Sequence, residues 1–304
     1  MNSKTLYLIN SRKFLILIII ILISNNLLSQ ITFERINENT DGVYRKTTLY
    51  QNKIYVAGDK FSEELQTGEY FIALLDTNCN EIWRKTYAIT HEEFNTRIVI
   101  TDLVPDTNNN CFYASFQVVY FYNGNTVAYK ESYIVKFSEN GILQWKHMTS
   151  RFTGTNPSNS SQVCVNSNGN ISYFNPLVQK TSKGGFYISS LSPYGDSLYS
   201  INIQIDTINY LIPTRMIYMN NSFYISCMAK DENNKNEAQP CFLKVNENGQ
   251  VDWLKKYIII ENASLDDGIS DLVFRNNSFY ILAYFGGWYY TYLIKVDING
   301  NLQY

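Results

Sequence analysis

A unit of about fifty residues recurs along this 304-residue chain, and it constrains the fold more than any other feature. The three clearest copies are YIVKFSENGILQW at 133–145, CFLKVNENGQVDW at 241–253 and YLIKVDINGNLQY at 292–304. Two weaker copies occupy 71–83 and 187–199. Each copy contains a strand pattern, a polar turn and a second strand that ends in Trp or Tyr, which predicts a β-hairpin in every repeat.

The turn of this hairpin carries glycine in four copies, where a tight turn needs a positive φ. The residues at this position are Cys79, Gly141, Gly195, Gly249 and Gly300. An aromatic residue follows four positions later in every copy, at Trp83, Trp145, Tyr199, Trp253 and Tyr304. We expect these aromatic side chains to pack between neighbouring repeats rather than to stack on a ligand.

Two further strand patterns precede each hairpin, as in GISDLVFRN and SFYILAYF of the last repeat. Four short strands per repeat predict an all-β fold, a β-propeller of about five four-stranded blades. Stacking around an axis would allow each blade to bury both of its faces against its neighbours.

The predicted domain organisation is a signal peptide at 1–29 followed by a propeller at 30–304. The repeats span roughly 37–89, 90–151, 152–206, 207–260 and 261–304, the last completed by 31–36. In this arrangement the N-terminal strand closes the ring and removes an open sheet edge. The alternatives are a chain cut short before further repeats and one module of a larger surface protein.

The N-terminus has the pattern of a secretory signal. Lys4, Arg12 and Lys13 precede the apolar run at 14–24, and Ser29 is the expected cleavage position. The alternative is a membrane anchor, but the apolar run is shorter than the roughly 20 residues that span a bilayer. The pattern predicts a secreted, periplasmic or cell-surface protein with no stable membrane span after cleavage.

Composition excludes several functions. The formal net charge is −2, and it becomes −5 if cleavage removes the three basic residues, so no nucleic-acid partner is expected. Histidine occurs only twice, and no nucleotide-binding or nucleophile motif is present, so the sequence predicts no cofactor and no metal. Cys227 and Cys241 are expected on neighbouring strands of one hairpin, either as a disulfide or as free buried thiols.

Charged residues are predicted to meet at the axis. Aligning the repeats places Lys46, Asp102, Arg215 and Asp271 at one level of the innermost strand, with Val163 or a neighbour in the third repeat. Because charge is costly between packed blades, these side chains are expected to point into the central channel. They would either fill and seal the channel or form a polar pocket for a sugar, peptide or ion.

The loops that enter the innermost strands add carboxylates at Asp41, Glu92, Glu93, Asp206, Asp266 and Asp267. Carboxylates from different blades could act as acid and base in glycoside hydrolysis, if two or three converge in an open channel. The absence of any catalytic motif favours a non-catalytic binding or scaffold propeller with a protein or glycan partner. A carbohydrate-active enzyme of the five-bladed type is the alternative, and ion pairs that close the channel would argue against it.

The pattern Y-x-x-K-x-x-x-N-G-x-x-x-W, followed by an Asp-Gly pair and an F-Y-I strand, resembles the propeller-like repeats of exported bacterial surface proteins. It is also similar to the repeats of quinoprotein-like propellers. The resemblance covers nearly all of 31–304, and the third repeat departs furthest, with Ser190 at the Lys position. It implies a propeller fold, no enzymatic activity and no named ligand.

Overall fold

A computed structural model describes residues 42–62, 67–77, 79–122, 126–153, 162–176, 185–231, 239–257, 268–285 and 290–303. The predicted signal peptide at 1–29 and the predicted closing strand at 31–36 therefore lie outside the described residues.

The protein is a five-bladed β-propeller, as predicted, and the described residues contain strands and turns but no helix. Within each antiparallel sheet, strands that follow one another in sequence are neighbours. The first two sheets contain β1 (Val43–Tyr50), β2 (Lys53–Ser62), β3 (Thr67–Leu75), β4 (Glu81–Ile89), β5 (Asn95–Asp106), β6 (Cys111–Phe121), β7 (Val127–Ser138) and β8 (Leu143–Thr153).

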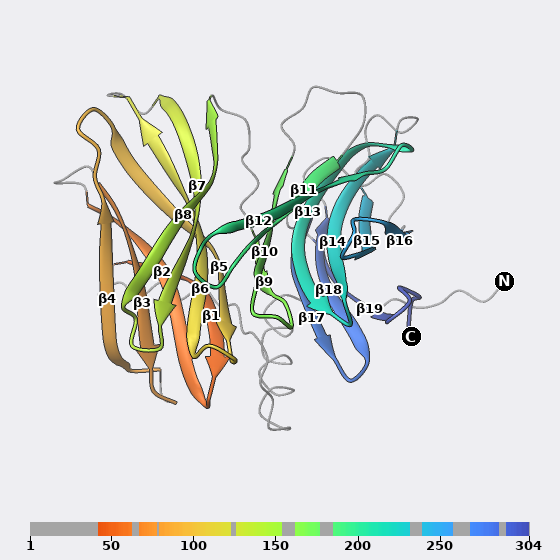
Figure 1. Ribbon diagram of the computed structural model, residues 1–304, viewed down its shortest axis with the longest axis horizontal. Helices are drawn as coiled ribbons and strands as arrows, with labels where there is room; N and C mark the ends of the chain where they lie inside the picture. Colours follow the sequence, from red (N-terminus) through yellow and green to blue (C-terminus); the bar gives the residue numbers. More distant parts are fainter. Residues whose placement is uncertain are drawn as a thin grey trace.

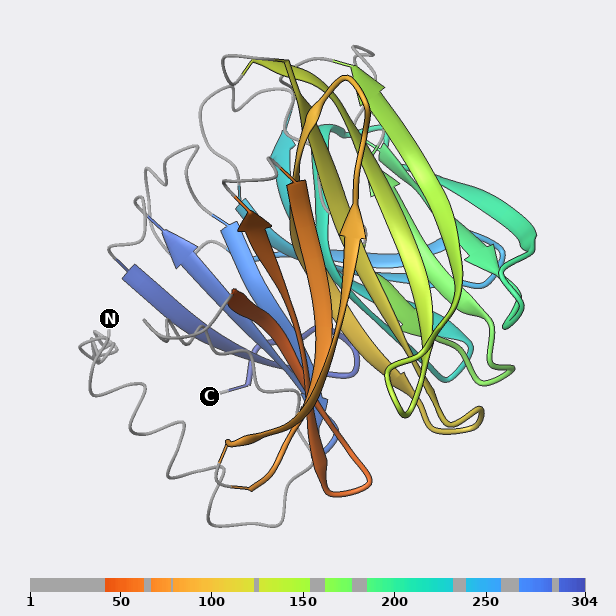
Figure 2. The same cartoon turned by 90° about the vertical axis from the view of Figure 1, so that its left-hand side faces the viewer.

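The remaining sheets follow the same order along the chain. They contain β9 (Val163–Val165), β10 (Ile171–Pro176), β11 (Gly185–Leu191), β12 (Ser197–Gln204), β13 (Ile208–Met219), β14 (Ser222–Asp231), β15 (Gln239–Asn246), β16 (Val251–Lys256), β17 (Gly268–Arg275), β18 (Ser278–Phe285) and β19 (Tyr290–Asp297). In Figure 1, β1, β5, β9 and β17 lie near the centre, and β4 and β16 lie at opposite edges. Figure 2 looks onto the first sheets, whose strands cross one another with the usual twist.

The last sheet has three strands within the described residues, and the chain turns back at its outer edge. Gly300 has a φ of 75°, and Leu302 forms an isolated bridge with Val296 of β19. The backbone N–H of Gln303 donates to the carbonyl of Lys295 at 2.9 Å. The C-terminal residues thus begin a fourth strand in the last blade.

Turn chemistry explains how the hairpins form. Gln51–Asn52, Asn220–Asn221 and Asn276–Asn277 join the first two strands of three blades, and all six residues have positive φ. Two consecutive positive φ values define the turn type that suits tight hairpins, and asparagine tolerates that conformation. In the later hairpin of the second blade, Gly141 has a φ of 74°, as predicted. Cys79 takes this conformation in the first blade, with a φ of 64°.

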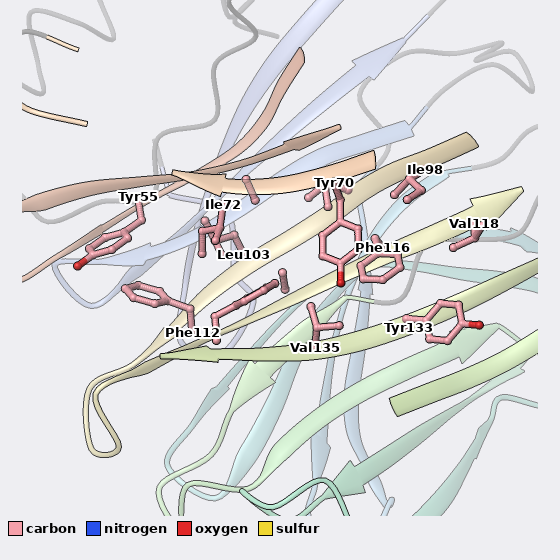
Figure 3. Close-up of a cluster of buried hydrophobic side chains, with 14 of the residues drawn as sticks. Tyr55, Tyr70, Ile72, Ile98, Leu103, Phe112, Phe116, Val118, Tyr133 and Val135 are labelled. Atoms are coloured by element: carbon pink, nitrogen blue, oxygen red, sulfur yellow. The ribbon is translucent and has the colours of Figure 1, made fainter. Parts of the chain in front are cut away.

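The hydrophobic core lies between the sheets rather than at the axis. Figure 3 shows the cluster between the first two blades, where Tyr70 stacks on Phe116 with ring centroids 4.5 Å apart. Comparable clusters join the second blade to the third, the third to the fourth and the fourth to the fifth. Each blade therefore needs its neighbours in order to bury its apolar faces.

The tryptophans of the outer strands connect neighbouring blades. A Cβ added at Gly141 would lie 2.5 Å from the Trp83 ring, so this glycine allows the previous blade's tryptophan to pack on the turn. Trp145 meets Gly195 and Trp253 meets Gly300 in the same way. The predicted packing between blades is confirmed for these three. Tyr199 differs, because its side chain is 39% exposed and Ile201 meets the turn at Gly249 instead. Tyr304 lies outside the described residues.

Candidate functional site in the axial channel

Four innermost strands each contribute one charged residue to a layer at the axis: Lys46 on β1, Asp102 on β5, Arg215 on β13 and Asp271 on β17. In all four strands, the pairing with the next strand shifts immediately before the charged residue, at Arg45, Thr101, Thr214 and Ser270. A β-bulge of this kind bends the strand and re-aims the following side chain. The repeated bulge therefore sets the four charged side chains at one level around the axis.

Arg215 is the centre of this charged layer. Its Nη1 lies 3.5 Å from Oδ1 of Asp102, and its Nε lies 3.3 Å from Oδ1 of Asp271. Nε also donates to the carbonyl of Ser270 at 3.3 Å. The Arg215 side chain is only 10% exposed, so this guanidinium neutralises two carboxylates while it is largely buried.

The carboxylate of Asp102 has backbone partners as well. The N–H of Leu103 donates to Oδ1 at 3.0 Å, and the N–H of Val163 donates to Oδ2 at 3.1 Å. Asp271 accepts from the N–H of Leu272 at 3.0 Å. Both acids are therefore held by an arginine and by the backbone.

Gln162 completes the layer in the third blade, directly before the predicted position at Val163. Its side-chain carbonyl accepts a hydrogen bond from Nη1 of Arg215, and its Nε2 donates to the carbonyl of Thr101 at 3.2 Å. The sequence predicts Val163 or a neighbour at this level of the channel, and the neighbour found there is Gln162, directly before β9. The irregular third repeat obscured this position because β9 is only three residues long.

Lys46 differs from the other three charged residues. Within the described part of the chain, its ammonium group has no hydrogen bond or ion pair, although it experiences the charges of Arg215, Asp102 and Asp271. Burial lowers the pKa of Lys46 to about 8, Arg215 adds to this effect, and the two carboxylates oppose it. Lys46 is thus a largely buried cation without a direct counter-ion among the residues that the structure describes.

The charged layer separates two pockets along the axis. The lysine pocket, of about 430 Å³, lies on the side where the innermost strands begin and includes Lys46, Ile100, Pro213 and Ile269 in its lining. The carboxylate pocket, of about 450 Å³, lies on the side where these strands end and includes Asp102 and Asp271. Arg215 lines both. A layer of charged residues therefore crosses the channel, with a pocket on either side.

A second unpaired donor lines the lysine pocket. Gln117 on β6 pairs with Val99 of β5, and its side chain is one of the polar groups in the pocket lining. The residue is 9% exposed, and its Nε2 makes no hydrogen bond with the described residues. An unpaired buried donor costs about 1–3 kcal/mol, so this arrangement is unfavourable unless a ligand or water accepts the bond.

The carboxylates predicted in the entry loops do not converge with the channel within the described residues. Glu92 and Glu93 are exposed, and neither lines the two pockets. Asp41, Asp266 and Asp267 lie outside the described residues. Among the residues that the structure describes, no group of three metal-ligating side chains occurs. The same residues include no helix that is long and apolar enough to cross a membrane.

The two thiols of the fourth blade occupy directly opposed positions on β14 and β15. Cys227 pairs with Cys241 in the register of these strands, as expected, and both are fully buried free thiols. Burial raises the pKa of Cys227 well above its usual value, and a hydrogen bond with Cys241 adds to the rise. Of the two states that the sequence left open, the structure contains the free thiols.

Fold and channel together define the class of protein: a five-bladed β-propeller with a charged partition on its axis. Searches found no matching family model and no matching curated protein. The resemblance to repeats of exported bacterial surface proteins therefore stays a prediction.

Several solved structures are similar in fold. A GH43 endo-arabinanase from Bacillus licheniformis is 12% identical with a TM-score of 0.44, covering 85% of this chain and 95% of that one. CoXyl43, a GH43 β-xylosidase/α-arabinofuranosidase from a compost metagenome, is 9% identical with a TM-score of 0.48, covering 91% and 98%. Cobalt-substituted Synechocystis ACO is 12% identical with a TM-score of 0.44, and this chain covers 57% of its length. At these identities and TM-scores the likeness says nothing about activity.

Proposed function

We propose that this protein is a non-catalytic binding propeller that holds a glycan in the lysine pocket. One observation carries the proposal: Lys46 and Gln117 present donors that have no partner among the described residues to a pocket of about 430 Å³. This volume lies within the usual range of roughly 300–1,000 Å³ for small-ligand sites. Apolar side chains such as Ile100 and Pro213 line the same pocket, so it suits a sugar ring, which has C–H faces and a polar edge.

The positions of Asp102 and Asp271 favour binding without hydrolysis. Glycoside hydrolysis needs one carboxyl group as a proton donor and a second as a base or nucleophile. Asp102 and Asp271 both pair with Arg215, and they line the opposite pocket from Lys46. Within the described residues, the lysine pocket therefore offers no carboxyl group for either role.

A glycoside hydrolase remains the second candidate because Asp102 and Asp271 come from different blades and line one pocket. Release of reducing ends from a panel of polysaccharides tests this candidate. Hydrolysis that is lost in both Asp102→Asn and Asp271→Asn would establish the enzyme and overturn the non-catalytic proposal. The proposal expects no hydrolysis by the wild-type protein.

A glycan array probed with the purified full chain tests the binding proposal. We expect retention of a limited set of glycans and at least tenfold weaker retention by the pocket variant Gln117→Leu. The matched control is Lys85→Met, since Lys85 is an exposed residue of β4 that does not line the pocket. Absence of binding to every glycan would contradict the proposal.

We further propose an extracytoplasmic location, supported only by the signal-like pattern at 1–29. Expression of the full chain in a bacterial host, followed by fractionation and N-terminal sequencing, tests this location. The expected product begins at Gln30 and lies outside the cytoplasm. An uncleaved product in the cytoplasm would contradict it.

A further inference from the structure

Resting on the proposed function, we infer that the lysine pocket selects an acidic glycan, with the sugar carboxylate accepting hydrogen bonds from Lys46 and Gln117. The first step of the argument is the sign of the pocket. Among the described residues, its charged lining residues are Lys46 and Arg215, and no described carboxylate belongs to the lining. The acids that balance Arg215 lie on the other side of the layer and line the carboxylate pocket.

The second step is the type of hydrogen bond that remains unmade. An ammonium group has donors and no acceptor, and Nε2 of Gln117 is a donor as well. Both lack partners within the described residues, whereas Gln162 and Arg215 are already engaged with each other. A pocket that offers free donors selects a group that only accepts, and an ionised carboxylate has two such oxygens.

The third step is the electrostatic state of Lys46. Burial and three charged groups determine it: burial and Arg215 disfavour its positive charge, while Asp102 and Asp271 favour it. The first two effects prevail, so the pKa of Lys46 falls to about 8. A ligand carboxylate beside the ammonium would supply the missing counter-charge and raise that pKa. A neutral sugar would not do so.

The charge balance of the layer favours a ligand with one negative charge over a ligand with two. With Lys46 protonated, the charged layer contains two cations and two anions. A single carboxylate leaves a small local excess of negative charge, whereas a phosphate dianion would leave a larger one beside two buried acids. Uronic and sialic acids have the required monovalent group on a sugar ring.

The test compares acidic glycans with their carboxyl-reduced counterparts, which differ only at the acid group. A panel of uronate- and sialate-containing oligosaccharides is titrated calorimetrically into the wild-type full chain at pH 7. We expect the acidic form of at least one glycan to bind about tenfold or more tightly than its reduced form. Lys46→Met should remove this preference, and the exposed-lysine control Lys85→Met should retain it.

The pH profile provides a readout that needs no variant. Affinity of the wild-type protein for the acidic form should decline as the pH rises from 8 to 10, because Lys46 loses its proton there. Affinity for a reduced form should change little over this range. A flat profile for the acidic form would overturn the role of Lys46 even if Lys46→Met failed to fold.

The remaining outcomes separate the two proposals. Equal binding of acidic and reduced glycans would overturn the acidic preference and leave the glycan-binding function standing. Binding of acidic peptides but no glycan would overturn both. Ser132, the cross-strand partner of Gln117 on β7, also has an unpaired buried hydroxyl. If Gln117→Leu lowers stability without altering glycan affinity, Gln117 has a structural role and its part in ligand binding is overturned.

Discussion

Arg215 and Asp271 form an ion pair at the propeller axis, with 3.3 Å between Nε and Oδ1, although they come from different blades. The same guanidinium lies 3.5 Å from Asp102, which belongs to the second blade. This layer links innermost strands of different blades through charged side chains, in addition to the hydrophobic clusters between neighbouring sheets. Ion pairs therefore contribute to the contacts at the axis, and apolar packing joins the sheets. Substitutions in the two regions should change the free energy of unfolding for different reasons.

Replacing Arg215 tests the charged layer. Arg215→Met leaves Asp102 and Asp271 without their cation, and breaking a buried pair in this way costs about 3–5 kcal/mol. We expect the free energy of unfolding in urea titrations to fall by that amount. The control is Lys244→Met, because Lys244 and Asp252 form a partly exposed pair at 2.9 Å that contributes about 0–1 kcal/mol. Equal effects of the two substitutions would contradict this account of the axis.

Replacing Lys46 should have the opposite effect on stability at neutral pH. The folded protein lowers the pKa of Lys46 to about 8, below the value of about 10.4 in an unfolded chain. The unfolded state therefore binds more protons between pH 8 and 10, and stability rises with pH in this window. Below pH 8 the charged lysine is unfavourable, by roughly 3 kcal/mol at most. Lys46→Met should raise the free energy of unfolding at pH 7.

The pH dependence distinguishes this cause from a change in packing. The advantage of Lys46→Met over the wild type should shrink towards pH 10, where both proteins have an uncharged residue at this position. Denaturant titrations at pH 7, 8.5 and 10 measure it. A difference that is constant with pH would indicate packing, and a loss of stability at pH 7 would contradict the unfavourable charge.

The contact between Trp83 and Gly141 can be tested with a matched pair of glycines. Gly141→Ala places a Cβ 2.5 Å from Trp83 at a φ of 74°, so strain and overpacking add to about 2–5 kcal/mol. Gly169 has a similar φ of 77°, but its nearest neighbour is the end of the Asn109 side chain at 3.0 Å. Gly169→Ala should cost only about 1–2 kcal/mol. Thermal or urea unfolding measures both losses of unfolding free energy. Equal losses in the two variants would contradict the packing of Trp83 on Gly141.

The paired cysteines predict a result for thiol titration. Cys227 and Cys241 are fully buried, so an alkylating reagent should not reach them in the folded protein. Exposed Cys79 should react quickly, and mass spectrometry of digested protein separates these sites. In denaturant without reductant both buried residues should become reactive. If they stay unreactive until reductant is added, the pair is a disulfide.

The fold was predictable because its signal is repeated. The hairpin turns fix strand ends through residues such as Gly141. The tryptophans pack between blades as expected, and the structure adds that they do so on these turns. The contact of the third blade with the turn of the fourth was not predictable in this way. Ile201, and not the aromatic residue Tyr199, packs on that turn at Gly249. A repeat pattern specifies the type of contact, and local volumes determine which residue makes it.

The charged layer was predictable in part. Aligning strands placed Lys46, Asp102, Arg215 and Asp271 at one level, and the shared bulges set them there. The alignment could not show that Arg215 pairs with both Asp102 and Asp271, because pairing depends on three-dimensional distances. For the same reason it could not show that Lys46 has no counter-ion among the described residues. Gln117 was missed because it belongs to the second strand of its blade, where no repeat marks a channel position.

Chemical labelling of Lys46 tests the central claim most directly. A lysine with a pKa near 8 should react with limiting acetic anhydride at pH 8 ahead of ordinary lysines. The measurement is the labelling rate of Lys46 and Lys85, by peptide mass spectrometry, with and without a saturating glycan from the binding screen. The account predicts that the glycan protects Lys46 and leaves Lys85 unchanged. Equal labelling of Lys46 in the free and saturated protein would contradict a ligand site in the lysine pocket.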